Sequence, residues 1–592
     1  MRVNDYIITY LKEKKVSTIF MVAGGQAMFL NDAVCRTKQI SPIFTHHEQS
    51  AGMAAEAYGR ISGKLGVVMV TAGPAAINVL NGVVGGWTDS SPMMVISGQS
   101  PLPNVKYMEK TNIRQFGLQG IYIKPLVESI TKYFVTVEDP ANIAYYMEKA
   151  YYLATTGRFG PVWLEIPLDI QRMEVSAKLI KHFYPPAITS QQNIVKKQVD
   201  KTLALLYKSR RPLLLAGQGV RNAKADETLS KLLDKMNVPI ITTRLGIDLV
   251  ESSHPLFVGR PGLYGDRAAN LAIQLSDFIL AVGARLDPGI IGYDAEDWGR
   301  QAQKVIIDID PKELEKPGIQ NSLRFRSDAQ EFLGELLETV KIHKMSVSKK
   351  WITHCSKLKN KYPTVLPSYK NEHPVNSYYL SERLSYAAKP SDVIVVDTSS
   401  PFHVVCQTWN IKKGQRFITT GGISTMGYWA AAIGACLAKQ RKRTIVVTGD
   451  GCLQMNIQEL ATVKHNQLPI KLFVINNNGY LLIRHTQKTH MEGRLIGESP
   501  STGIWCPDSI AIAKAYGIYA VKIKSADGID KKIKEVLDYN GPVVCDVDSP
   551  QWQAIIPRVS SEKKPDGTLV SKSYEDMYPF LDKKELEEQM NP

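Results

Sequence analysis

Thr444-Ile445-Val446-Val447 and Lys471-Leu472-Phe473-Val474-Ile475 are the stretches of this sequence that decide its fold. Both are continuous apolar runs, which is the pattern of strands covered on both faces. Amphipathic helical stretches separate further runs of this kind, which lie at 66–70, 92–96, 212–216 and 304–308. Strands that alternate with helices in this way predict an α/β protein with doubly wound parallel sheets.

The length of the chain and two interruptions of this rhythm predict its domains. A chain of 592 residues is too long for a single hydrophobic core. The segments 172–193 and 341–373 are charged and contain prolines, so we interpret the first as a linker and the second as a helix with a linker. Three domains are therefore expected at 1–175, 195–340 and 374–550, followed by a tail at 551–592 that ends in a short helix over 583–590.

The chain is basic, with a formal net charge of +15 from 72 Lys plus Arg against 57 Asp plus Glu. The basic residues are scattered, and the densest groups, 208–211 and 439–443, each precede an apolar run. We interpret these groups as solvated turns, with attraction of anionic substrates as the alternative. No nucleic-acid-binding motif accompanies the charge, so no nucleic-acid partner is expected.

The cysteines and the apolar stretches bear on the compartment. The seven cysteines are isolated and lack the spacing of a metal site, which is typical of a reducing cytoplasm. The N-terminus has neither secretory nor transit character. The longest apolar stretch, about 427–438, is too short to span a bilayer and is rich in small residues. We expect a soluble, cytoplasmic protein without membrane contact.

The strongest functional signal follows the two strands quoted first. Strand 444–447 runs into Gly449-Asp450-Gly451, and strand 472–475 ends in Asn476-Asn477-Asn478-Gly479, with 24 residues between the two motifs. Open α/β sheets bind ligands at the carboxyl ends of parallel strands. Glycines let the backbone approach a diphosphate closely. Asp450 and Asn477 offer the hard oxygen ligands that Mg²⁺ prefers.

Gly-Asp-Gly followed at this spacing by paired asparagines resembles the signature of the thiamine-diphosphate enzymes. The resemblance implies thiamine diphosphate as the cofactor and a Mg²⁺ ion held by Asp450, Asn477 and the carbonyl group of Gly479. It also implies that the three domains are pyrimidine-binding, central and diphosphate-binding. The residues that it places beside the diphosphate are Gly449, Gly451 and Cys452.

The segment 45–60 resembles the glutamate-bearing segment of acetolactate synthase and its relatives. The resemblance implies that Glu48 contacts N1′ of the aminopyrimidine and holds the proton that activates the thiazolium carbon. By itself, a glutamate that opens an alanine-rich helix also suits the helix N-terminus. Gln119 is implied on the acceptor side as a second catalytic residue, and the further cofactor contacts are Gly24, Gly73, Asn78, Gly422, Ser424 and Met426. Because the glutamate and the diphosphate site of this family come from different subunits, a homodimer or homotetramer is implied.

The central domain carries a weaker cofactor signal. Ala216-Gly217-Gln218-Gly219 follows a strand, and Val282-Gly283-Ala284-Arg285 follows another. The resemblance implies an FAD-binding domain whose contacts include Gly217, Gly219, Gly283, Arg285 and Asp308. However, a basic residue that often follows the arginine is absent, and Pro288-Gly289 stands there instead. FAD therefore stays an open alternative at this point.

Two departures from the family pattern bear on the reaction. The segment 116–121 lacks the His-His pair with which pyruvate decarboxylases help to release an aldehyde. Thr486 stands nine residues after Asn477, where acetolactate synthases have a bulky Trp that shapes the acceptor pocket. The first departure favours carboligation, and the second favours an acceptor larger than pyruvate. The candidate acceptor contacts are Leu482, Arg484, His485, Thr486 and Gln487, although these side chains would also suit a helix surface.

The tail segment 557–580 looks like a subgroup of acetolactate-synthase-like proteins, and some members of that broader group act on nucleotide-linked keto sugars. We therefore predict a carboligase that decarboxylates a 2-keto acid, pyruvate, and transfers the resulting unit to a carbonyl acceptor such as a nucleotide-linked keto sugar. The alternatives are an acetolactate synthase proper, a decarboxylase that releases an aldehyde, and a non-catalytic or nucleic-acid-binding protein.

Overall fold

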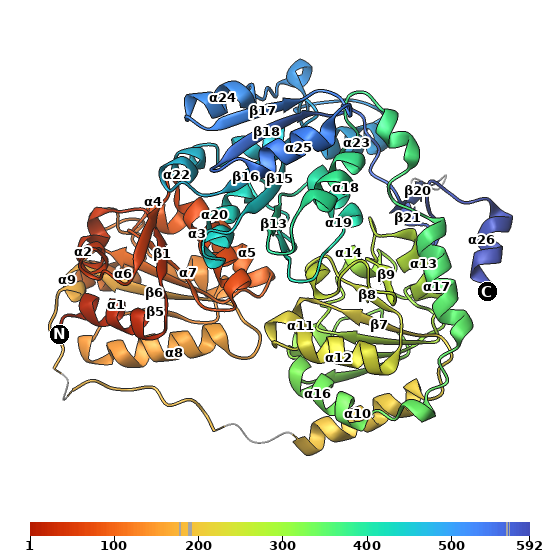
Figure 1. The fold of residues 1–592 in the computed structure, drawn as a ribbon. Helices are drawn as coiled ribbons and strands as arrows, with labels where there is room; N and C mark the ends of the chain where they lie inside the picture. Colours follow the sequence, from red (N-terminus) through yellow and green to blue (C-terminus); the bar gives the residue numbers. More distant parts are fainter. Residues whose placement is uncertain (177–178, 188–191, 564–565, 567–568, 592) are drawn as a thin grey trace.

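The computed structural model describes residues 1–176, 179–187, 192–563, 566 and 569–591, and its three large sheets are six-stranded. Every strand pairing within these sheets is parallel. Helices surround each sheet, as Figure 1 shows. The prediction of an α/β protein with three doubly wound parallel sheets is therefore confirmed. We call the sheets with their helices the first, central and third domains.

The first sheet has the order β2-β1-β3-β4-β6-β5. Alternate residues of its third strand enter two different cores, Val68 and Val70 on one face and Val67 and Met69 on the other. Burial on both faces explains the continuous apolar run at this strand. The strands are β1 (Thr18–Met21), β2 (Ser41–Phe44), β3 (Gly66–Val70), β4 (Met93–Gln99), β5 (Phe134–Thr136) and β6 (Pro161–Pro167). The helices are α1 (Val3–Glu13), α2 (Met28–Arg36), α3 (Glu48–Ser62), α4 (Pro74–Asn78), α5 (Leu80–Thr88), α6 (Leu102–Thr111), α7 (Lys124–Val127), α8 (Ile143–Thr155) and α9 (Leu168–Gln171).

The central sheet has the order β12-β11-β10-β7-β8-β9. The chain moves outward from β7 to one side and then returns to add β10 on the other side, so the sheet has a switch point between these two strands. The strands are β7 (Pro212–Ala216), β8 (Ile240–Thr242), β9 (Phe257–Gly259), β10 (Phe278–Val282), β11 (Gln303–Asp308) and β12 (Ser322–Arg326). The helices are α10 (Gln192–Leu206), α11 (Gln218–Asn222), α12 (Asp226–Met236), α13 (Arg267–Leu275), α14 (Pro288–Ile291), α15 (Pro311–Leu314), α16 (Ala329–Thr339) and α17 (Lys349–Lys361).

The third sheet, β14-β13-β15-β16-β18-β17, repeats the strand order of the first. Its central strands β15 and β16 are the two apolar runs that open the sequence analysis, and they pair from Thr444 opposite Ile470 onward. The strands are β13 (Val393–Val396), β14 (Arg416–Thr419), β15 (Thr444–Gly449), β16 (Ile470–Asn476), β17 (Tyr519–Ile523) and β18 (Val543–Asp548). The helices are α18 (Ser377–Ala387), α19 (Ser400–Thr408), α20 (Ala431–Ala438), α21 (Asp450–Gln454), α22 (Glu459–His465), α23 (Leu481–His490), α24 (Ser509–Ala515) and α25 (Ile529–Asp538).

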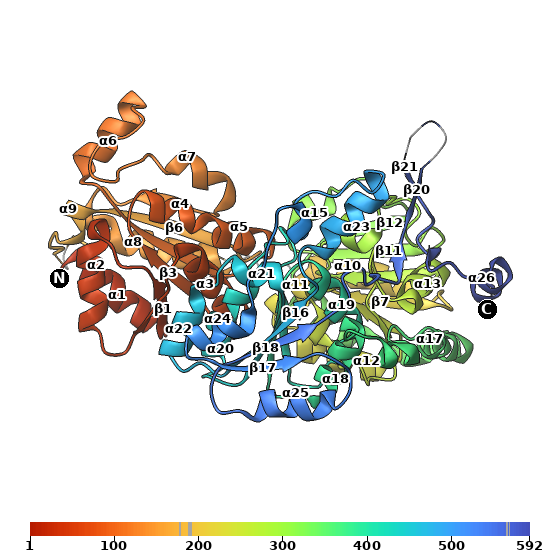
Figure 2. The ribbon, with the colours of Figure 1, turned by 90° about the horizontal axis from the view of Figure 1, so that it is seen from above.

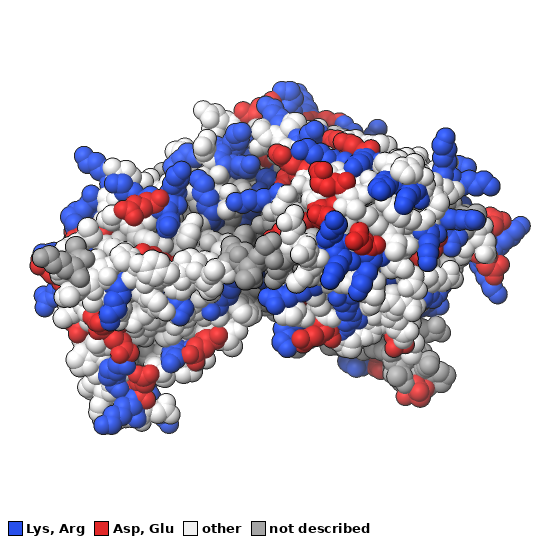
Figure 3. Space-filling view, turned by 90° about the horizontal axis from the view of Figure 1, so that it is seen from below, with Lys and Arg blue, Asp and Glu red and all other residues white. Residues whose placement is uncertain are grey.

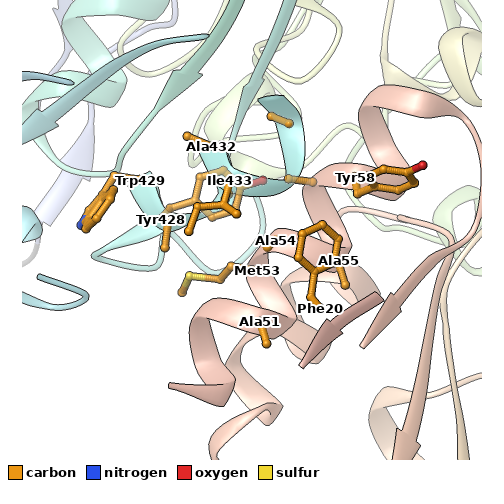
Figure 4. Close-up of a cluster of buried hydrophobic side chains, with 14 of the residues drawn as sticks. Phe20, Ala51, Met53, Ala54, Ala55, Tyr58, Tyr428, Trp429, Ala432 and Ile433 are labelled. Atoms are coloured by element: carbon orange, nitrogen blue, oxygen red, sulfur yellow. The ribbon is translucent and has the colours of Figure 1, made fainter. Parts of the chain in front are cut away.

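The first and third domains pack against each other through α3 and α20 (Figure 4). Both helices present small residues to this contact, including Ala51 and Ala54 on α3 and Ala432 on α20. The backbones approach so closely that a Cβ added at Gly434 would lie 1.8 Å from the carbonyl oxygen of Ala54. Helix α20 is the long apolar stretch noticed in the sequence, and it is buried between two sheets. In the described part of the chain, no helix is long and apolar enough to cross a membrane.

The segments outside the sheets are more ordered than the sequence suggested. The helix expected within 341–373 is α17. Residues 177–178 and 188–191 of the expected linker at 172–193 lie outside the described residues. The tail docks on α13 of the central domain, where Asn270 Nδ2 donates a hydrogen bond to the Tyr574 carbonyl (3.1 Å) and Met577 is buried. It ends in the predicted helix, α26 (Lys583–Met590).

The two remaining views show the outer shape and the charge. From above, α6 projects outward from the first domain, away from the other two domains (Figure 2). On the face shown in Figure 3, Lys and Arg side chains are spread widely and are interspersed with acidic ones. On this face the basic side chains form no single continuous patch. Each of the seven cysteines is a free thiol.

Candidate active site

The carboxyl edge of the third sheet brings the predicted metal ligands together. Strand β15 ends at Gly449 and α21 begins at once with Asp450, which is only 5% exposed. Asp450 Oδ1 accepts a hydrogen bond from the Gly451 amide (3.0 Å), and Oδ2 accepts one from the Gly479 amide (2.8 Å). Because β16 lies beside β15, the loop that follows β16 passes directly over the start of α21.

Asn477 supplies the observation that tests this edge as a metal site. Its side chain is 3% exposed, and Oδ1 is buried without a hydrogen-bond partner among the described residues. Leaving a buried acceptor unsatisfied costs about 1–3 kcal/mol, and a cation would remove that cost. Burial raises the pKa of Asp450 to about 6, although hydrogen bonds from Gly479 and Gly451 favour the carboxylate. A buried carboxylate beside an unsatisfied amide oxygen fits Mg²⁺.

No group of three or more His, Cys, Asp or Glu side chains that could hold a metal occurs in the described part of the chain. The Asp450–Asn477 edge instead combines one carboxylate with an amide oxygen. The two glycines beside Asp450 differ in the space around them. A Cβ added at Gly449 would meet no described atom within 4 Å, whereas one at Gly451 would lie 2.0 Å from the Tyr480 ring. Cys452 is buried, and burial raises the pKa of its thiol.

The loop at 420–427, which we call the pyrimidine loop because its family counterpart contacts the pyrimidine ring, contains the predicted cofactor contacts Gly422, Ser424 and Met426, and the first domain holds it. The amides of Gly421 and Gly422 donate hydrogen bonds to the two carboxylate oxygens of Asp89, both at 2.8 Å. A Cβ at Gly422 would lie 2.3 Å from Thr88, so the two segments approach closely. Further along the loop, Ser424 is exposed and has φ 47°. Met426 is half-buried, which distinguishes it from an ordinary core methionine.

The carboxyl edge of the first sheet carries the second group of predicted residues. Helix α3 begins with Glu48, whose Oε2 accepts a hydrogen bond from Asn78 Nδ2 (3.0 Å) at the end of α4. Gly73 has φ 64°, and a Cβ there would lie 2.5 Å from the carbonyl oxygen of Gln119. A Cβ at Gly24 would lie 2.5 Å from Thr71 Cγ2, in the loop after β3. The structure therefore groups these predicted residues around the ends of β1, β2 and β3.

The two edges are distinct sites within one chain. The start of α3 reaches the third domain through the His46 amide, which donates to Glu459 (3.1 Å), and through Ser50, which donates to Asn456 (3.0 Å). Within the described residues, no hydrogen bond or ion pair joins Glu48 to Asp450 or Asn477. Gln119, in the exposed loop between α6 and α7, has φ 59° and faces solvent.

A cavity of about 630 Å³ lies between the three domains at the switch point of the central sheet. Four of the five candidate FAD residues line it, namely Gly219, Gly283, Arg285 and Asp308. The fifth, Gly217, packs behind the lining, because a Cβ there would lie 2.2 Å from the Gly283 carbonyl oxygen. Burial raises the pKa of Asp308 to about 6. Gly421 and Ser424 of the pyrimidine loop also line the cavity, which therefore abuts that loop.

Three lining residues were missed by the sequence analysis. Arg244 packs over the Phe402 ring at 4.9 Å and donates to the Tyr264 carbonyl (2.8 Å), and burial lowers its pKa. The His403 ring lies 4.0 Å from the Tyr264 ring, and burial followed by the Arg244 charge lowers its pKa. Arg244 follows β8 by two residues, so its place after a parallel strand was a usable signal. Phe402 and His403, inside a helix, offered none.

The acceptor segment lies on α23, and most of its polar side chains are bonded to the protein itself. Arg484 is buried and forms an ion pair with Glu498. His485 Nε2 lies 2.8 Å from the Gln553 carbonyl oxygen. Gln487 bonds both the amide and the carbonyl of Ile496. These interactions explain the polar residues structurally and leave half-buried Leu482 and exposed Thr486 as the remaining acceptor candidates.

Comparisons with known proteins agree with this arrangement. Family models for the thiamine pyrophosphate enzyme N-terminal TPP binding domain, central domain and C-terminal TPP binding domain match residues 1–118, 199–336 and 397–547. Thiamine pyrophosphate is another name for thiamine diphosphate. The acetolactate synthase large subunit of Lactococcus lactis is 31% identical over 94% of this chain and 94% of its own length.

Two further relatives extend the similarity. The acetolactate synthase isozyme 2 large subunit of Escherichia coli is 30% identical over 94% of this chain and 97% of its own length. The mitochondrial acetolactate synthase catalytic subunit of Saccharomyces cerevisiae is 29% identical over 93% and 81%. The matches run through all three sheets and both cofactor edges. This chain therefore belongs to the acetolactate synthase-like family of thiamine-diphosphate-dependent enzymes.

Proposed function

We propose that this enzyme decarboxylates a 2-keto acid, with pyruvate as the donor, and joins the remaining unit to a carbonyl acceptor larger than pyruvate. A nucleotide-linked keto sugar is an acceptor of this class. The observation that carries the cofactor half of the proposal is the buried Asn477 Oδ1 beside Asp450, which has no hydrogen-bond partner among the described residues. When bound, thiamine diphosphate supplies the nucleophilic carbon and the electron sink that decarboxylation needs.

The protein's own groups bind and orient that cofactor. Asp450, Asn477 and the Gly479 carbonyl would hold Mg²⁺, which in turn holds the diphosphate. Glu48 would keep a proton at N1′ of the aminopyrimidine. Asn78 donates to Glu48 Oε2, which fixes the carboxylate and leaves Oε1 without a hydrogen-bond partner among the described residues. This geometry supports Glu48 as the group that exchanges a proton with the cofactor.

Two residues support a large acceptor. Thr486 is exposed and carries a small side chain, so an acceptor beside α23 meets no bulky ring at this position. Gln119 is exposed at the carboxyl edge of the first sheet, where it would hydrogen-bond an acceptor brought to Glu48. The names of the relatives favour a second candidate function, acetolactate synthesis with pyruvate as the acceptor. Release of a free aldehyde is the third alternative.

Two further assignments belong to this proposal. FAD would occupy the 630 Å³ cavity, because Gly219 and Gly283 meet there with a hydrogen bond of 3.0 Å at the switch point of the sheet. Flavin absorbance in the purified enzyme would test this assignment.

A homodimer or homotetramer would bring Glu48 of one subunit to Asp450 of another. Exposed apolar residues around Gln119, notably Leu118 at 75% exposure and Phe116, support a subunit contact there.

Product analysis tests the reaction. The enzyme with Mg²⁺ and thiamine diphosphate is incubated with pyruvate alone and then with a panel of aldehydes, ketones and nucleotide-linked keto sugars. We expect slow product formation with pyruvate alone and a large increase with a bulky acceptor. Efficient acetolactate formation that no larger acceptor improves would establish the second candidate instead. Acetaldehyde as the main product would establish the third.

A further inference from the structure

One buried arginine, Arg484, hydrogen-bonds the backbone of the loop that follows β16. Arg484 lies on the first turns of α23, and its side chain folds back over residues 477–479, in the direction that helical side chains favour. Nη1 donates to the Asn477 carbonyl (3.3 Å) and Nη2 donates to the Asn478 carbonyl (3.1 Å). Two successive peptide oxygens of the proposed metal loop therefore bind one planar guanidinium.

Glu498 holds that guanidinium in place. Arg484 Nε donates to Glu498 Oε2 at 2.5 Å, and both side chains are only 2% exposed. Nη2 also donates to the Glu498 carbonyl (3.2 Å), and Nη1 donates to the Gln551 carbonyl. Every nitrogen of the guanidinium is thus engaged with the protein. A buried arginine whose donors are all used is a fixed template and is not available to bind a substrate.

The loop is enclosed from its other side as well. The Tyr480 amide donates to the Glu498 carbonyl (2.8 Å), and the Gly479 amide donates to Asp450 Oδ2 (2.8 Å). Gly479 has φ 130°, and a Cβ there would lie 2.0 Å from the Glu498 carbonyl oxygen. The backbone at 477–480 is therefore fixed between Asp450 and the Arg484–Glu498 pair. Within this enclosure, Asn477 Oδ1 is the buried atom that keeps no partner among the described residues.

We propose that Arg484, oriented by Glu498, is a positioning residue that sets the affinity of the metal site by holding the carbonyls of Asn477 and Asn478. The inference rests on the proposed function, because it takes Asp450 and Asn477 as metal ligands. It goes beyond that function by assigning metal affinity to a residue that touches neither metal nor substrate. Such outer partners typically alter metal affinity by about 10–100-fold when they are changed.

Arg484→Lys in the full-length enzyme is the direct test. Lysine keeps a positive charge opposite Glu498, but a single ammonium group cannot bridge both carbonyls as the planar fork does. Mn²⁺ is titrated in the presence of thiamine diphosphate, and its binding is followed by electron paramagnetic resonance. We expect the dissociation constant for Mn²⁺ to rise by about 10–100-fold. The Michaelis constant for pyruvate at saturating metal should stay unchanged.

Arg383→Lys is the matched control, because Arg383 forms an exposed ion pair with Asp530 in the same domain (2.7 Å). It should leave Mn²⁺ affinity unchanged. Glu498→Gln is the second variant. It keeps the shape and an acceptor for Arg484 but removes the charge, so a smaller loss of up to about tenfold is expected. If Arg484→Lys fails to fold, Glu498→Gln decides the question.

Mn²⁺ affinity that stays unchanged in the folded variants, even with a lower melting temperature, would overturn the proposal and leave Arg484 a purely structural residue. Asp450→Ala separates this outcome from failure of the proposed function. If Asp450→Ala abolishes Mn²⁺ binding while Arg484→Lys does not weaken it, only the positioning role is lost. If Asp450→Ala retains full Mn²⁺ affinity, the metal assignment itself is lost, and the positioning role with it.

Discussion

The first and third sheets share one strand order, but their carboxyl edges are built differently. At the third sheet, Asp450 and Asn477 are at most 5% exposed, and backbone hydrogen bonds fix the loops around them. At the first sheet, Glu48 is half-buried with Asn78 as its partner, and Gln119 is exposed.

The difference in burial between the two edges bears on which partner each edge would bind, a cation at the third sheet and a second subunit at the first. The third edge is an enclosure in which Asn477 Oδ1 has no partner among the residues that the structure describes, and a cation would supply one. The first edge has a positioned carboxylate with open surroundings, which a second subunit would cover. Under the proposed function, the metal-binding half lies within one chain, and association of two chains would bring the proton-exchange half to it. The following predictions test this contrast.

Asp450→Ala should have the largest effect, because it removes a metal ligand from the enclosed edge. We expect Mg²⁺ and thiamine diphosphate binding to be lost together, with a fall in kcat/KM greater than the roughly 100-fold typical of residues that only support a ligand. Isothermal titration with thiamine diphosphate, with and without Mg²⁺, measures the loss. Cofactor binding that persists at wild-type affinity would show that the carboxyl edge of the third sheet does not bind the metal through Asp450.

Glu48→Gln should have the next largest effect, and on a different step. The amide keeps the size of the side chain and its bond with Asn78 but cannot exchange a proton with the cofactor. We expect cofactor affinity to be retained and proton exchange at the thiazolium carbon to slow by about 10²–10⁴-fold, the range of general acid–base catalysis. Deuterium exchange followed by NMR measures the rate. An unchanged rate would remove Glu48 from the mechanism.

The meeting of Asp450 and Asn477 at one edge of the sheet could be predicted from sequence because its determinants are local. Asp450 and Asn477 each follow an apolar strand directly, and parallel neighbouring strands must bring their carboxyl ends together. Gly219 and Gly283 also follow strands, and the structure brings them together at the switch point of the central sheet. Arg244 likewise lies close to the end of a parallel strand, two residues after β8. In these cases the strand end itself is the signal.

The role of Arg484 could not be predicted in this way. Its partners Glu498 and Gln551 lie 14 and 67 residues further along the chain, and no periodicity relates them. The sequence suggested an acceptor contact for Arg484, whereas its burial and its pairing with Glu498 make it a support for the loop at 477–479. Docking of the tail on α13 was also missed, because a short charged segment shows no face that must be buried.

Asn78→Ala should have a smaller effect than either change above. It leaves the Glu48 carboxylate in place but removes the hydrogen bond that orients it. A hydrogen bond to a charged group contributes about 1.5–3 kcal/mol, so we expect kcat to fall by about 10–150-fold. Steady-state rates at saturating cofactor measure the change. A loss as large as that of Glu48→Gln would show that Asn78 acts on the cofactor directly.

Gly434→Ala should have the smallest effect on catalysis and acts on the contact that joins the two edges. Helix α3 begins with Glu48, and α20 follows the Met426 loop, so their packing sets one edge relative to the other. The added methyl group would lie 1.8 Å from the Ala54 carbonyl oxygen, which forces the helices apart. Overpacking of this kind typically costs about 1–3 kcal/mol, which a lower melting temperature would report. Gly334→Ala in α16, where the new Cβ meets no described atom within 4 Å, is the control and should be neutral or slightly stabilising. Equal melting temperatures for the two variants would show that the α3–α20 contact relaxes around the added methyl group, and that this packing does not fix one edge relative to the other.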